Sequence, residues 1–191
     1  MPNDKAKSKP RQLDEGHFFA ELEGQIVRRL KAEAGSQEGR DVLLRDTGIR
    51  DQKLIEELGR LGITSDGILA LRVFPLALVA WAEGSADVRE RQAVMAEAIQ
   101  LGITDGSAAW ILLDQWLDRR PPGLGVDAWR RYVHSIFADM SDVAQKRIIE
   151  LTQRQMTSIA KASGGHLGFG KVSKKEQAVI DQIVTAMQRQ R

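Results

Sequence analysis

Cysteine is absent from the sequence. Disulfide frameworks, zinc ribbons and thiol nucleophiles are therefore excluded, and the absence is typical of a reducing compartment, so we expect a cytoplasmic location. Histidine is scarce as well, and His17, His134 and His166 stand too far apart in the sequence to indicate a zinc site or a nucleophile–base pair. We expect no enzymatic activity.

Segments that alternate in polarity and are rich in β-branched residues are also missing, whereas apolar residues recur every three to four positions along most of the chain. This pattern predicts an all-α protein, a compact bundle of about eight to nine helices.

The longest apolar stretch, residues 68–82, is interrupted only by Arg72 and Pro75. As a helix it would span roughly 22 Å, which is short of the ~30 Å of a bilayer core. A buried core helix is therefore favoured over a membrane span. Pro75 is expected either to kink this helix, which we favour, or to open a second helix at its first position.

The first residues, MPNDKAKSKPRQ, are basic and have no apolar run behind them that would indicate a signal sequence. We expect residues 1–12 to be a disordered tail, residues 13–65 a helical extension, and residues 66–191 the main helical domain. The tail carries a net charge of +3 and the whole chain +2, so the remainder sums to −1. This balance argues against a nucleic-acid partner; binding through the tail is the weakest functional hypothesis.

The string Leu-Gly-Ile-Thr occurs twice, at residues 61–64 and 101–104, each time at the end of an amphipathic segment. A glycine that ends a helix commonly adopts a left-handed conformation, and the apolar residue after it packs back onto the same helix. We therefore expect positive φ angles at Gly62 and Gly102, with each isoleucine packed inward. Each threonine is expected to be the N-cap of the next helix.

Two heptapeptides, GSADVRE and GKVSKKE, begin at Gly84 and Gly170 and have the same layout. Each has a helix-capping residue three positions after its glycine and a glutamate six positions after it. This spacing predicts capping boxes, in which the cap and the glutamate satisfy each other's backbone amides. The pairs are Asp87 with Glu90 and Ser173 with Glu176. From physical chemistry alone these glutamates are structural, each cap contributing on the order of 1 kcal/mol.

The stretch ALVAWAEGSADVRERQAVMAEAI resembles the signature of tellurite resistance TerB-like domains. In that family a small apolar helix ends in Ala-Asp-Gly, and the next helix begins with a cap and a glutamate six residues after the glycine. GFGKVSKKEQAVIDQI is similar to the corner that closes such domains, and the resemblance covers residues 66–187. The chain has Glu83 where the family usually has aspartate, and Phe169 before Gly170.

The resemblance implies an all-α fold, a role in tellurite and other stress responses, and action in complexes at a membrane surface. It also implies that acidic corner residues bind a divalent metal ion such as calcium, with Gly84 and Gly170 forming the turns. The implied ligands are Glu83, Glu90 and Glu176, and Asp87 lies between the first two. Since hard cations require six or more oxygens, a capped corner in contact with solvent is favoured over an ion site.

The leading functional hypothesis is a noncatalytic module that docks a partner protein in a groove between helices, with Trp81 and Glu83 at its rim. The second is metal sensing or sequestration at the acidic corner. The four tryptophans are expected in the core, although an exposed one on a groove would mark a partner site. They are Trp81, Trp110, Trp116 and Trp129.

Overall fold

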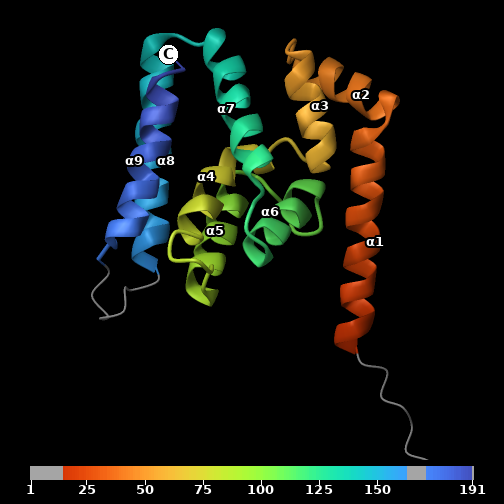
Figure 1. The fold of residues 1–191 in the computed structure, drawn as a ribbon, viewed down its shortest axis with the longest axis horizontal. Helices are drawn as coiled ribbons and strands as arrows, with labels where there is room; N and C mark the ends of the chain where they lie inside the picture. Colours follow the sequence, from red (N-terminus) through yellow and green to blue (C-terminus); the bar gives the residue numbers. More distant parts are fainter. Residues whose placement is uncertain (1–14, 163–170, 191) are drawn as a thin grey trace, which may run out of the picture.

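The computed structural model describes residues 15–162 and 171–190. Within these ranges the chain forms nine α-helices and no strand, which confirms the prediction of an all-α bundle (Figure 1). The expected tail, residues 1–12, lies outside the described residues. The helices are α1 (Glu15–Gly35), α2 (Gln37–Thr47), α3 (Gln52–Leu61), α4 (Ala70–Ala80), α5 (Val88–Gln100), α6 (Ala108–Asp118), α7 (Gly123–Ala138), α8 (Asp142–Ala162) and α9 (Lys174–Gln188).

The centre of the bundle is α4, in which nine of eleven residues are buried. It contacts α5, α6, α7, α8 and α9, because a helix that is apolar over most of its surface must be covered on several sides. The ring of Phe74 meets that of Trp116 edge to face, with centroids 5.0 Å apart. Pro75 lies inside α4, so it does not open a second helix.

In the described part of the chain, no helix is both long and apolar enough to cross a membrane.

Helices α1, α2 and α3 lie on one side of the bundle and α8 and α9 on the other (Figure 1). The link to the centre is α3, which packs against α1, α2 and α7. Gly59 allows α1 to approach closely, since a Cβ there would lie 2.7 Å from the carbonyl oxygen of Ala34. On the other side of α3, the buried Glu57 forms an ion pair of 3.2 Å with Arg131 of α7.

Both Leu-Gly-Ile-Thr corners end a helix as expected. Gly62 and Gly102 have φ angles of 75° and 85°, in the left-handed region. The amide of Ile63 donates to the carbonyl of Leu58 at 2.9 Å, and that of Ile103 to Ala98 at 3.0 Å. Both isoleucines are buried. These are the bonds of a glycine-terminated helix end, with the apolar residue packed back onto the helix.

The expectation that each threonine caps the next helix is wrong. Thr64 Oγ1 accepts from the amide of Gly67 at 3.2 Å, inside a turn that precedes α4. At the second corner Ser107 caps α6 by accepting from the amide of Trp110. At the second corner Gly106 has a φ of 74°, so α6 begins only after it. At the first corner the amide of Gly67 donates to the carbonyl of Thr64 at 3.0 Å, which closes a turn ahead of α4.

The two corners differ in what surrounds the glycine, and this predicts different costs of substitution. Gly62→Ala and Gly102→Ala should each lower the free energy of unfolding by about 1–2 kcal/mol, because alanine is strained in the left-handed region. Gly62→Ala should lower it further, since the new Cβ would lie 2.7 Å from Lys31 Cγ, whereas nothing lies within 4 Å at Gly102. Urea unfolding measures both. In a Lys31→Ala background, the losses of unfolding free energy caused by Gly62→Ala and Gly102→Ala should become more similar. Equal losses for the two substitutions in the wild-type background would contradict the interpretation.

Candidate functional site

The corner between α4 and α5 forms the predicted capping box. The amide of Asp87 donates to Glu90 Oε2 at 2.9 Å, and the amide of Glu90 donates to Asp87 Oδ1 at 2.8 Å. Glu90 is only 3% exposed, whereas Asp87 and Glu83 are exposed. Gly84 forms the turn with a φ of 105°. The glutamate therefore holds the start of α5 from inside the fold.

The start of α9 forms the second predicted box. The amide of Ser173 donates to Glu176 Oε2 at 2.5 Å, and the amide of Glu176 donates to Ser173 Oγ at 3.2 Å. Glu176 is 2% exposed, and its other oxygen, Oε1, is buried with no hydrogen-bond partner among the described residues. Gly170 lies outside the described residues.

The two corners are neighbours in space although they are far apart in the sequence. Burial raises the pKa of Glu90 to about 7 from an ordinary 4.5, against the opposing effect of the hydrogen bond from the Asp87 amide. The negative charges of Asp87, Glu176 and Glu83, in that order, contribute to the same rise in pKa. The fold thus brings two buried carboxyl groups together, one from each capping box.

The three implied metal ligands and the neighbouring candidate Asp87 are only partly assembled. Glu90 and Glu176 are both buried, and the charge of Glu176 contributes to the raised pKa of Glu90, while Glu83 and Asp87 are exposed to solvent. Across residues 15–162 and 171–190, no group of three or more histidine, aspartate or glutamate residues is placed to hold a metal ion. In each corner the buried glutamate uses one carboxylate oxygen to accept a hydrogen bond from the backbone amide of the N-cap residue. The primary role of both corners is therefore to start a helix.

Two tryptophans, Trp116 and Trp129, are buried in the core, and Trp81 and Trp110 are half-buried. The indole Nε1 of Trp81 donates to the carbonyl of Trp116 at 2.8 Å. This bond ties the end of α4 to α6. Trp81 therefore contributes to packing between the central helices, and Glu83 beyond it is exposed.

The raised pKa of Glu90 should make the free energy of unfolding depend on pH. The folded protein keeps this proton up to about pH 7, whereas the unfolded chain loses it near 4.5, so stability declines as the pH rises through that interval. Glu90→Gln keeps an acceptor for the Asp87 amide and should remove the decline. Between pH 5 and pH 8, the free energy of unfolding of the variant should rise relative to that of wild type by on the order of 1 kcal/mol. Urea unfolding across that range measures it; the exposed Glu38→Gln is the control, and parallel pH profiles for all three proteins would contradict the prediction.

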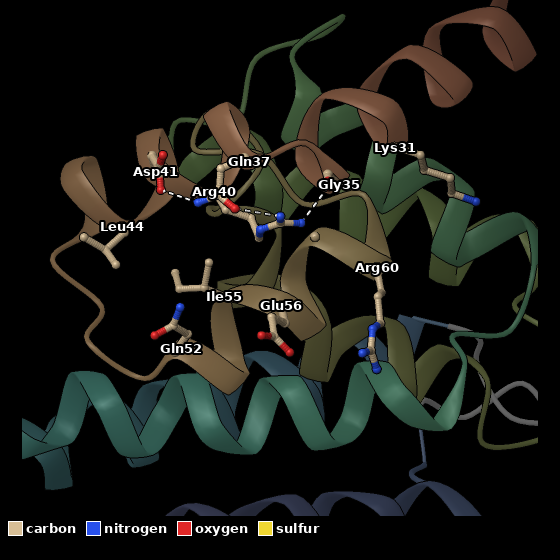
Figure 2. Close-up of a pocket in the computed structure, with 11 residues that line it drawn as sticks. Lys31, Gly35, Gln37, Arg40, Asp41, Leu44, Gln52, Ile55, Glu56 and Arg60 are labelled. Atoms are coloured by element: carbon tan, nitrogen blue, oxygen red, sulfur yellow. Dashed lines mark hydrogen bonds between the residues drawn. The ribbon is translucent and has the colours of Figure 1, made fainter.

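A pocket of about 480 Å³ lies where α1, α2 and α3 meet, and we call it the α1–α3 pocket (Figure 2). Its apolar part consists of Ile55, which is 3% exposed, and Leu44, which is 46% exposed. Figure 2 shows Leu44 at one end and Lys31 and Arg60 at the other. Charged side chains from all three helices complete the lining, namely Lys31, Arg40, Asp41, Glu56 and Arg60.

The charged groups of the α1–α3 pocket are not neutralised by contact with one another. Arg40 donates to neutral acceptors, the carbonyl of Gly35 at 2.6 Å and Gln37 Oε1 at 2.9 Å. Asp41 accepts from Gln37 Nε2 at 2.9 Å. No ion pair involves the pocket's lysine, its two arginines or its two carboxylates within the described ranges. Their charges are available to a ligand that supplies partners.

A second recess runs between α7 and α9 above α4, and we call it the α7–α9 groove. It consists of an apolar pocket of about 170 Å³ and a neighbouring pocket of about 480 Å³. The two share Arg130, Gln182 and Ala186. Sequence analysis missed both the groove and the α1–α3 pocket, because each is lined from three helices whose relative positions leave no mark on local periodicity. One signal was present: a glycine inside a helix, such as Gly59, indicates close approach of another backbone.

Comparison of the chain with protein-family models, with curated proteins and with solved structures finds no match.

Proposed function

We propose that this chain is a noncatalytic, TerB-like interaction module of the tellurite-resistance and stress-response type, which docks a partner protein in the cytoplasm or in a complex at a membrane surface. The observation that carries the proposal is the α1–α3 pocket, where the half-exposed Leu44 stands beside the buried Ile55 among charges without ion-pair partners. This docking site is distinct from the one expected around Trp81 and Glu83, which stays a prediction.

The composition of the α1–α3 pocket supports protein docking. Protein interfaces combine an apolar centre with a polar rim, and a few buried side chains carry most of the affinity. Covering Leu44 would remove apolar surface from water at about 25 cal/mol per Å². Lys31 and Arg60 on one side, and Asp41 and Glu56 within the same lining, would select for a partner with matching charges.

A noncatalytic role is supported by the hydrogen bonding of Glu90, the one carboxyl group in the described residues whose pKa is raised to about 7. A raised pKa in a cleft is a frequent mark of an active site, but structural networks produce it too. Glu90 is buried and bound to the amide of Asp87, and its neighbour Glu176 is bound in the same way to Ser173. Both groups therefore act on helix starts rather than on a substrate.

Partner capture from extracts of the protein's own cells tests the docking site. Wild type should form a stoichiometric complex, measured by light scattering of the purified assembly, and Leu44→Glu should weaken it at least about tenfold by placing a charge in the apolar centre. Leu151→Glu is the matched control, because Leu151 is similarly exposed at 41% but lies on α8, away from the pocket. Loss of the complex in both variants, or in neither, would contradict the proposal, as would turnover of a substrate by the pure protein.

A second candidate function is binding of a divalent metal ion between the two corners. It is favoured by the buried Oε1 of Glu176, which lacks a hydrogen-bond partner among the described residues, and by the effect of the Glu176 charge on the pKa of Glu90. The residues fit a hard cation only in part, since such ions take six or more oxygens and no third acidic group converges there.

Calorimetric titration with calcium, magnesium, zinc and manganese tests the second candidate. If the site binds an ion, wild type should release or absorb heat, and Glu176→Gln and the double variant Glu83→Gln, Glu90→Gln should lose that heat, because amide oxygens do not carry the charge the ion needs. Glu150→Gln, at an exposed carboxylate on α8, is the control. Identical heats in every protein would rule the metal site out.

A further inference from the structure

The α7–α9 groove has an apolar floor recessed between two helices. Trp129 and Ile183 are 3% and 5% exposed, so they belong to the core and close the groove from below. The half-buried Leu78, Val126 and Val179 complete this apolar part, one from each of α4, α7 and α9. The pocket of about 170 Å³ that they surround has room for one aliphatic or aromatic side chain.

The rim of the groove is basic. Arg120, Arg130 and Arg189 line it, against a single carboxylate, that of Asp181. Within the described residues Arg120 and Arg189 form no ion pair. Arg130 lies 3.8 Å from the exposed Asp127, a surface contact of small energy that a ligand can replace.

The dimensions of the groove favour a helical ligand. Its wall on α9 extends from Val179 to the end of the helix, which is between two and three helical turns or roughly 14 Å at 1.5 Å per residue, and Arg189 and Gln190 continue it in the turn that follows. An amphipathic helix lying in a groove between two helices uses apolar anchors three or four residues apart, with polar residues at the edges. A membrane surface fits less well, because its binding requires apolar side chains that protrude, whereas Trp129 and Ile183 are recessed.

We propose that the α7–α9 groove binds an acidic amphipathic helix of a partner protein. One apolar side chain of that helix fills the pocket beside Val179, and its aspartates and glutamates pair with Arg120, Arg130 and Arg189. Guanidinium groups suit this role, since they bind carboxylates through two parallel hydrogen bonds. The groove is separate from the α1–α3 pocket, so this inference goes beyond the proposed function and does not depend on it.

Synthetic peptides with the full chain test this inference. The probes are an acidic helix with leucine anchors and glutamate flanks, the same helix with lysine flanks, and the acidic helix with its anchors changed to serine. Binding is measured by fluorescence anisotropy and located by the NMR signal of the Trp129 indole. The acidic leucine peptide should bind at least about tenfold more tightly than either other peptide, and it should shift the Trp129 signal.

Charge-reversal variants supply the matched comparison. Arg120→Glu with Arg189→Glu should weaken the acidic peptide at least about tenfold, whereas Arg147→Glu, at an exposed arginine of α8 outside the groove, should leave it unchanged. The milder Arg120→Gln with Arg189→Gln should weaken it in the same direction, and circular dichroism verifies that each variant is folded. Equal binding of acidic and basic peptides, or equal losses in the groove and α8 variants, would overturn the inference. So would groove-dependent binding of vesicles containing phosphatidylserine in the absence of peptide binding.

Discussion

Burial of α4 is the constraint on which the rest of this structure depends. Nine of its eleven residues are buried, with Arg72 exposed, and five other helices pack against it. Each covering helix must begin or end near α4, so the chain needs turns that are tight and well defined. Left-handed glycines end helices at Gly62 and Gly102, and side-chain caps start them at Asp87 and Ser173.

The packing of α5 and α9 against α4 also creates an electrostatically unfavourable feature of the fold, the burial of two glutamates. Helices α5 and α9 both start beside the centre, and both use a glutamate to hold the first turn. Each capping bond stabilises its helix, but the two carboxyl groups end up buried near each other. Burial is the main reason that the pKa of Glu90 is raised, and the negative charges of Asp87 and Glu176 add to the rise. The capping box stabilises each helix start locally, but its use at both helices places two buried carboxyl groups where they repel each other.

Local features of this fold follow from the sequence, and the pairing of distant segments does not. The φ angles at Gly62 and Gly102 and both capping boxes depend on residues a few positions apart, and these were predicted correctly. The threonine caps were not, because the Asp-Gly pair after each threonine inserts another turn before the helix. The proximity of Glu90 and Glu176 depends on how α5 and α9 approach α4, and no spacing along the chain encodes it. The same holds for the α1–α3 pocket and the α7–α9 groove.

Gly59 has a consequence for the shape of the surface. The missing side chain lets the backbone of α3 lie against the carbonyl of Ala34, and the same glycine lines the α1–α3 pocket. The width of that pocket is therefore set by a backbone-to-backbone contact, which is stiffer than a contact between rotatable side chains. A methyl group at position 59 would clash with the carbonyl of Ala34 and push α1 away from α3. Related chains that carry a larger residue there would have a differently shaped recess, and with it a different choice of ligand.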